Sequence, residues 1–115
     1  MEKPYNHCMY TFIELPVFTR HADIYFENGE LAELQVALAD NPKQGDVVPG
    51  TGGVRKLRWA RPGMGKRGGL RILYYLQDNA GRIWLLTMYA KSAHENIAAS
   101  TLKTLREMAD HAEIV

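Results

Sequence analysis

The sequence predicts an α+β fold in which an antiparallel sheet has helices packed on one of its faces. Three β-like segments follow one another with short connections, which indicates an antiparallel meander. Helical periodicity occurs on both sides of these segments, and the expected order of elements is β-α-α-β-β-β-α. The chain has 115 residues, of which 46% are hydrophobic and 23% charged. These values suit a single domain over residues 1–115 with its own core.

The first half of the chain predicts one strand and two helices. Residues 10–15 are β-branched or aromatic, which favours a short strand. Pro16 interrupts it, and its fixed φ suits the first turn of a helix over residues 17–26. A second helix is expected over residues 30–39, because Leu31, Leu34 and Leu38 form one apolar stripe before Pro42.

The second half predicts three strands and a last helix. The strands are expected at residues 54–59, 70–77 and 83–91, with a hairpin turn at residues 78–81 between the last two. Ser92 and Glu95 have the spacing of a capping box, so we expect the final helix to begin at Ser92. Its apolar stripe comprises Leu102, Leu105, Ala109 and Ala112.

Positive charge is concentrated in the middle of the chain. Residues 1–50 contain 3 basic and 8 acidic side chains, residues 51–91 contain 9 and 1, and residues 92–115 contain 2 and 4. The near-neutral total of +1 therefore conceals one strongly cationic segment. Such a segment indicates a polyanionic partner, although a merely solvated cationic face would give the same composition.

Strand alternation predicts where this charge lies. Lys56 and Arg58 share one side of their strand, whereas Arg55 points to the other side. Arg71 lies between apolar neighbours in the next strand, where a charge is costly unless it faces water or a partner. We therefore expect Lys56, Arg58 and Arg71 to project together from an open face as a cationic cleft.

Several classes of function are disfavoured. The glycine-rich loops at residues 43–53 and 63–67 lack both the G-K-[S/T] and the G-x-G-x-x-G pattern, which argues against a nucleotide loop. Cys8 is the single cysteine, so neither an internal disulfide nor a cysteine zinc site is expected, and we predict no metal or cofactor. No signal peptide or membrane span is apparent, which favours a cytoplasmic protein.

Three motifs resemble the RelE/HigB-like toxins of bacterial type II toxin–antitoxin pairs, especially the HigB branch. They are G-T-G-G-V-R-K-L-R at 50–58, G-G-L-R-I-L-Y-Y at 68–75 and L-L-T-M-Y-A-K at 85–91, followed by S-A-H-E-N. The resemblance covers roughly residues 12–110. It implies a microbial-RNase-like sheet and cleavage of messenger RNA, usually in the ribosomal A site. It also implies a cognate helix-turn-helix antitoxin, through which operator DNA is contacted only indirectly.

The resemblance also implies roles for individual residues. Arg71 matches the strand arginine that contacts the scissile phosphate, and Lys56 and Arg58 match basic positions used for proton transfer or phosphate binding. Lys91 and Tyr89 complete the expected catalytic set. Expected RNA-binding residues are Arg55, Arg61, Lys66, Arg67, Tyr75 and His94.

Some roles stay open. Other family members have a C-terminal catalytic tyrosine or a glutamate–histidine pair, and neither has a recognisable counterpart in this chain. The identity of the general base is therefore open, and Lys56 and Lys91 are both candidates. Tyr75 and Trp59 could stack on unpaired bases, but the large area that aromatic side chains bury favours the core for Trp59 and Tyr74.

Two other functions fit the same sequence. The chain could be a non-catalytic RNA- or ribosome-binding module, or a regulatory protein that binds an antitoxin or DNA and has lost activity. Catalysis depends on the placement of Arg71 and Lys56, whereas electrostatic binding tolerates their displacement. A neighbouring gene for a helix-turn-helix protein would favour the toxin.

Overall fold

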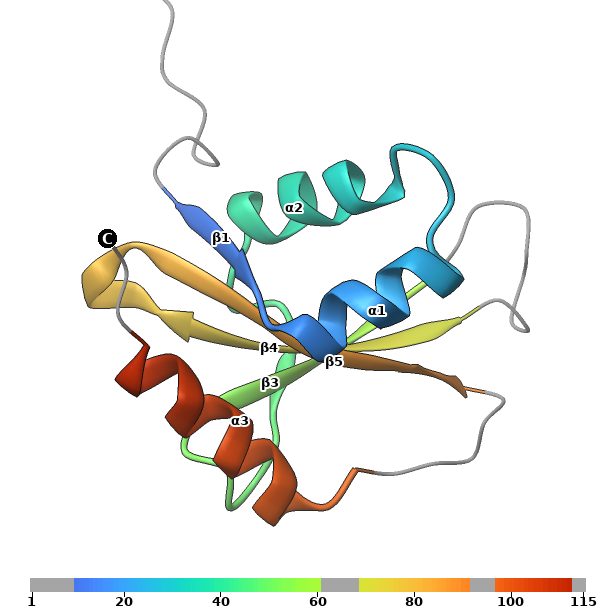
Figure 1. The fold of residues 1–115 in the computed structure, drawn as a ribbon. Helices are drawn as coiled ribbons and strands as arrows, with labels where there is room; N and C mark the ends of the chain where they lie inside the picture. The colour runs from blue at the N-terminus through green and yellow to red at the C-terminus, as the bar shows by residue number, and fades with distance from the viewer. Residues whose placement is uncertain (1–9, 61–68, 92–96, 113–115) are drawn as a thin grey trace, which may run out of the picture.

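Five strands form one mixed sheet in the order β1-β5-β4-β3-β2 (Figure 1). The computed structural model describes residues 10–60, 69–91 and 97–112. Strands β3 (Val54–Trp59), β4 (Leu70–Gln77) and β5 (Arg82–Ala90) form the predicted antiparallel meander. β1 (Thr11–Glu14) pairs with β5 in parallel, and the two-residue β2 (Asp46–Val47), which the sequence did not predict, pairs with β3. The α+β class and the order of the long elements are confirmed.

Helices α1 (Pro16–Tyr25) and α2 (Glu30–Asp40) cover one face of the sheet (Figure 1). Pro16 occupies the first turn of α1 as predicted, because its missing N–H would have no partner there. An apolar core fills the space between these helices and the sheet, with the Glu30 carboxylate buried beside it. It is made by Phe18, Ala22, Leu34, Leu38, Leu57, Leu70, Ile72, Tyr74, Ile83, Leu85 and Met88.

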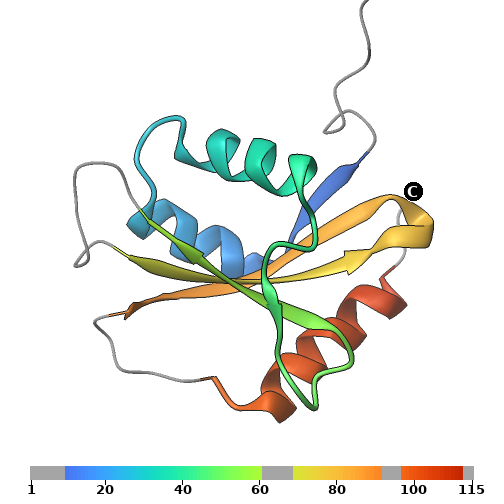
Figure 2. The same cartoon turned by 180° about the vertical axis from the view of Figure 1, so that it is seen from behind.

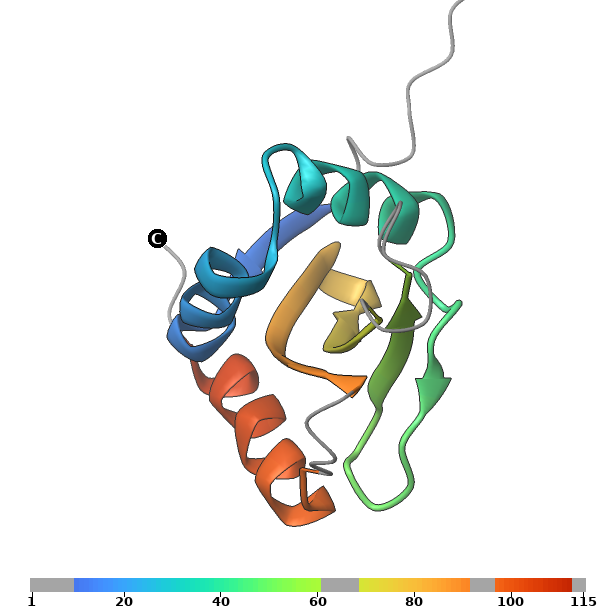
Figure 3. The ribbon, with the colours of Figure 1, turned by 90° about the vertical axis from the view of Figure 1, so that its right-hand side faces the viewer.

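Helix α3 (Ala99–His111) lies on the opposite face, so the prediction that all helices share one face was wrong. Its Leu102 and Ala109 pack in a second core with Leu15, Val54, Leu73, Trp84 and Leu86. Figure 3 shows α2 and α3 on opposite sides of the twisted strands. An amphipathic helix must bury its apolar stripe, and α1 and α2 already occupy the first face.

The start of α3 also differs from the prediction. The helix begins at Ala99, with Ala98 as a cap that makes no side-chain hydrogen bond. The expected capping box at Ser92 and Glu95 lies outside the described residues. α3 is therefore shorter than predicted, and it packs on the sheet at the end where Val54 and Trp84 lie.

A bulge in β5 changes which way its side chains point. Leu73 pairs with Thr87 but Tyr74 pairs with Leu85, so one extra residue lies in β5 between these pairs. Leu85 and Met88 consequently both face α1 and α2. Tyr89 then lies on the side of the sheet that carries α3. Without the bulge, strict alternation from Leu85 would have turned it toward α1 and α2.

The segment between α2 and β3 passes along the edge of the sheet (Figure 2). Polar groups hold it there. The Tyr74 hydroxyl donates to the Pro42 carbonyl at 2.7 Å and accepts from the Gly45 N–H at 2.9 Å. A Cβ on Gly45 would lie 2.9 Å from the Tyr74 ring, so this approach requires glycine. Thr51 then bridges Val48 and Val54, accepting from the Val54 N–H at 3.0 Å and donating to the Val48 carbonyl at 2.6 Å. The segment is thus held as one rigid edge of the sheet.

None of the helices described in residues 10–60, 69–91 and 97–112 is long and apolar enough to cross a membrane.

Candidate functional site

Three side chains form a row across the face of the sheet that carries α3. Arg58 is paired with Arg71 across β3 and β4, and Arg71 is paired with Tyr89 across β4 and β5. Paired residues of neighbouring strands point to the same face, so the two guanidinium groups and the phenol lie side by side. α3 packs farther along the sheet, over Val54 and Trp84, so the row is not part of its core.

Two arginines at directly opposed positions repel each other. Side chains at such positions have Cβ atoms about 4.5–5.5 Å apart, and like charges there are destabilising. Within the described residues, Arg58 and Arg71 have no carboxylate at salt-bridge distance, and the ion pair found is between Arg106 and Asp110. An arrangement that costs stability and lacks internal compensation suits an external anion that bridges both groups.

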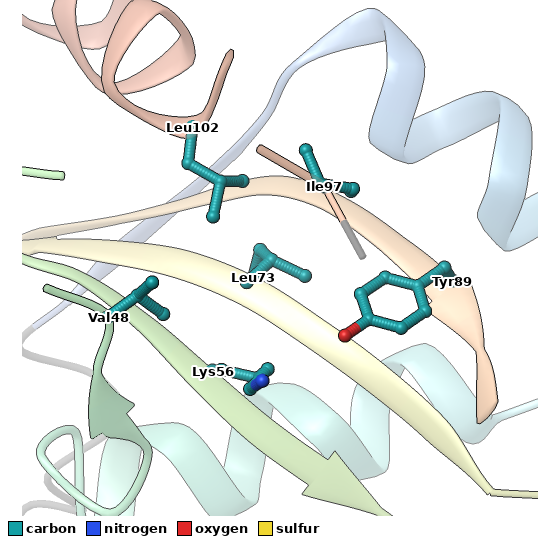
Figure 4. A pocket seen from close by; sticks show the side chains of 6 residues that line it. All are labelled: Val48, Lys56, Leu73, Tyr89, Ile97 and Leu102. Carbon is teal, nitrogen blue, oxygen red and sulfur yellow. The ribbon is translucent and has the colours of Figure 1, made fainter. Parts of the chain in front are cut away.

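Lys56 extends the row toward a pocket. It is paired with Leu73, two residues along β4 from Arg71, on the same face. Together with Tyr89 it lines a pocket of about 290 Å³ whose other walls are Val48, Leu73, Ile97 and Leu102 (Figure 4). Figure 4 shows the Tyr89 ring reaching over β4 with its hydroxyl directed toward the middle of the pocket. A cation and a phenol are thus brought together with apolar walls.

Lys91 lies one residue beyond the end of β5, and its side chain is exposed. Its backbone N–H donates to the Gly69 carbonyl at 3.0 Å, just before β4 begins. Lys91 is therefore at the same end of the sheet as Arg71.

Two predicted RNA-binding residues have internal partners. The Arg55 guanidinium donates to the carbonyls of Lys43 and Gly45 at 3.1 and 2.7 Å, on the face opposite Lys56. Tyr75 lies under Arg106, whose guanidinium carbon is 4.8 Å from the ring centre. The structure therefore gives Arg55 a role in holding the loop before β2, and the Tyr75 face that Arg106 covers is closed to a base.

The other aromatic candidates belong to the core. Tyr74 is fully buried, and Trp59 packs against the same cluster while its indole N–H donates to Glu30 at 2.9 Å. The core alternative for both residues is confirmed.

Four predicted RNA-binding residues lie outside the described residues: Arg61, Lys66, Arg67 and His94. Their roles stay predictions.

Sequence reasoning missed the apolar walls of the pocket. Val48 comes from the loop after β2, Leu73 from β4, Ile97 from the segment before α3 and Leu102 from α3. The sequence predicts Leu73 on the same face as Arg71 and Leu102 in the stripe of the last helix, but no local pattern indicates that these segments meet over β4.

The described residues contain no cluster of three or more histidine, cysteine, aspartate or glutamate side chains that could hold a metal ion.

Fold and site together define a small α+β protein with a cationic row and an adjoining pocket on one sheet face. Comparison with known proteins agrees with this class. The sequence model of the family described as the RelE toxin of the RelE/RelB toxin–antitoxin system matches residues 20–115. The chain therefore belongs to the RelE toxin family, whose members are toxins paired with an antitoxin. The HigB branch stays a prediction.

A solved structure shows the same fold. It is the free state of E. coli toxin RelE carrying two arginine-to-alanine substitutions. The match has a TM-score of 0.60 at 13% sequence identity and covers 84% of this chain and 96% of the other.

Proposed function

We propose that the chain is the toxin of a type II pair and a ribosome-dependent mRNA endonuclease. The observation that carries the proposal is the row of Arg58, Arg71 and Tyr89, with Lys56 beside it. Two guanidinium groups at opposed positions, with no carboxylate of the described residues at salt-bridge distance, form a fork suited to one phosphate of a nucleic-acid backbone. A bound phosphate offsets the repulsion that the free protein contains.

The proposed reaction is attack of an RNA 2′-OH on the adjacent phosphate. The 2′-oxygen bonds to phosphorus, the bond to the 5′-oxygen breaks, and a 2′,3′-cyclic phosphate and a 5′-OH result. Negative charge grows on the phosphoryl oxygens, and Arg58 and Arg71 stabilise it without reorganising, in the role that a metal ion has in other nucleases. Lys56 or Lys91 takes the proton of the 2′-OH, and Tyr89 gives one to the leaving oxygen.

The proposal includes the partner and the place of action. A cognate helix-turn-helix antitoxin binds the toxin in the cytoplasm and keeps it harmless until the antitoxin is removed. The complex contacts operator DNA through the antitoxin. The warrant is the family, since antitoxin pairing defines it. Co-purification from the native operon should yield a stable complex, and recovery of free, harmless toxin alone would contradict it.

Replacement of Arg71 by alanine tests the catalytic row. The substitution removes a planar donor from the transition state, which costs on the order of 10²–10³ in rate. The free protein should fold normally, because the change also removes a like-charge contact with Arg58. We expect Arg71→Ala to show the parent's circular dichroism and to have lost both growth arrest and new mRNA ends mapped by primer extension.

Arg20→Ala is the matched control. Arg20 is an exposed arginine on α1, on the opposite side of the sheet from the row, so this variant should remain as toxic as the parent. A folded Arg71→Ala protein that still cleaves mRNA would show that the row is not catalytic. Growth arrest without new mRNA ends in the parent would favour the binding module instead.

A further inference from the structure

We propose that the pocket next to the arginine row binds one unpaired RNA base and selects bases with a keto oxygen, guanine or uracil. The inference rests on the proposed function, because the base belongs to a nucleotide whose phosphate lies on the row. It assigns the Lys56 ammonium to base recognition, so that the proton of the 2′-OH goes to Lys91. It also gives a recognition task to residues that face no phosphate.

The pocket has an apolar floor and a mixed rim. Leu73 and Leu102 are 1% and 2% exposed and form the floor. Val48, Lys56, Tyr89 and Ile97 are half-buried and form the rim (Figure 4). The opening therefore leads from the charged row down to an apolar floor. Such a pocket favours a flat group that has apolar faces and a polar edge.

The position of the pocket suits the base of a bound nucleotide. Leu73 follows Arg71 by two residues on β4, a separation of about 6.6 Å along a strand. Tyr89 belongs both to the row and to the rim, so a phosphate on Arg71 places its own nucleotide beside the pocket. Single-stranded RNA is commonly bound through bases that stack on an aromatic side chain, which Tyr89 provides.

Lys56 gives the pocket its selectivity. Its ammonium group donates hydrogen bonds and accepts none. The N7 acceptor is common to both purines, so the distinction lies at the neighbouring position. Guanine O6 and uracil O4 are acceptors there, whereas adenine N6 and cytosine N4 are amino donors. An amino group against Lys56 would leave two donors facing each other among apolar walls. The preference for keto bases should be on the order of 10- to 100-fold in affinity.

Methyl NMR of the full-length protein can test binding without turnover. The probes are four trinucleotides with a central guanine, uracil, adenine or cytosine, all 2′-O-methylated so that the attacking hydroxyl is blocked. The guanine and uracil probes should shift the methyl signals of Val48, Leu73, Ile97 and Leu102 and bind at least about 10-fold more tightly than the other two. Equal affinity for all four, or shifts away from these methyl groups, would overturn the inference.

Two variants separate shape from charge. Val48→Phe should fill the pocket and abolish the methyl shifts, whereas Val36→Phe, at an exposed position on α2, should behave as the parent. Lys56→Gln offers both a donor and an acceptor, so it should reduce the keto preference to less than about threefold. A Lys56→Gln protein with the parent's preference would remove Lys56 from base selection.

Growth arrest measured in parallel separates this inference from the proposed function. If Arg71→Ala abolishes arrest while the four probes bind equally, only the base pocket is wrong. If the keto probes shift the pocket methyl groups while Arg71→Ala remains fully toxic, the pocket stands and the catalytic row is wrong.

Discussion

Arginine residues of this chain occur in two different settings, although their side chains are identical. Arg55 donates to loop carbonyls at 2.7 and 3.1 Å, and Arg106 donates to the Gly52 carbonyl at 2.9 Å. Arg58 and Arg71 instead face each other across β3 and β4. Each guanidinium that bonds to backbone carbonyls stabilises the fold, whereas the opposed pair forms no such bond and is the pair that we propose binds a phosphate.

Strand alternation was sufficient to predict the sides of the strand on which these arginines lie, but not the contacts that Arg55 makes. It correctly separated Lys56 and Arg58 from Arg55, because successive side chains of a strand point to opposite faces. It could not show that the loop at residues 43–45 would lie within reach of Arg55, since that contact depends on the Tyr74 hydroxyl 29 residues from Gly45. Tyr89 likewise reached the site only through the bulge in β5.

At the residue scale, we expect Tyr74→Phe to reduce the free energy of unfolding by about 1–3 kcal/mol. The Gly45 N–H is buried and would lose its acceptor, and the Pro42 carbonyl would lose its donor. Urea unfolding followed by circular dichroism measures the change. Tyr25→Phe, at a half-buried position on α1, should alter stability by less than about 0.5 kcal/mol.

The same tyrosine makes stability depend on pH. Burial raises the pKa of the Tyr74 hydroxyl, and this outweighs the lowering by the Gly45 hydrogen bond and by Arg55. As the pH rises past the ordinary tyrosine pKa of about 10, the unfolded chain loses this proton before the folded chain does. The stability that protonated Tyr74 contributes below about pH 10 should therefore be lost as the pH rises further. The free energy of unfolding should fall more steeply with pH in the parent than in Tyr74→Phe. Equal slopes would show that Tyr74 does not control the alkaline loss.

At the scale of secondary structure, local pattern predicted the strands better than the last helix. Strands at residues 54–59 and 70–77 have the predicted bounds, because glycine- or proline-rich segments flank their β-like sequences. The leucine stripe of α3 was also found, but a stripe does not specify which face of a sheet it covers. The two-residue β2 has no periodicity of its own and forms because the Tyr74 and Arg55 contacts place it beside β3.

α3 is attached to the sheet through Arg106. Its guanidinium lies over the Tyr75 ring, donates to the Gly52 carbonyl at 2.9 Å and pairs with Asp110 at 2.6 Å. Arg106→Ala should lower the free energy of unfolding by about 1–2 kcal/mol, since these partly exposed contacts are lost together. Asp110→Ala should cost only about 0.3–0.5 kcal/mol, as an exposed pair one helical turn apart. Urea unfolding measures both variants, with Lys103→Ala at an exposed position of α3 as the control. If Arg106→Ala lowers the free energy of unfolding no more than Lys103→Ala does, Arg106 does not attach α3 to the sheet.

At the scale of the whole molecule, α2 and the arginine row lie on opposite sides of the sheet and differ in charge. α2 carries Glu30, Glu33 and Asp40 without a basic residue, and it packs on one side of the sheet. Lys56, Arg58 and Arg71 lie on the other side. This arrangement gives the molecule an electrostatic direction although its formal net charge is only +1, so we expect a polyanion to approach the face that carries the row.

That direction predicts how RNA affinity depends on salt. Two phosphate contacts, one each for Arg58 and Arg71, should give a slope of at least about 1.4 for the decline of log affinity with log salt concentration. Fluorescence anisotropy with a labelled 2′-O-methylated single strand measures it without cleavage. Arg58→Ala should reduce the slope by about 0.7, because one counterion release is lost, while Arg20→Ala on α1 should leave it unchanged. A flat salt response, or the parent's slope in Arg58→Ala, would show that RNA does not bind on this face. A reduced slope in Arg58→Ala but not in Arg20→Ala would assign the phosphate backbone to the arginine row.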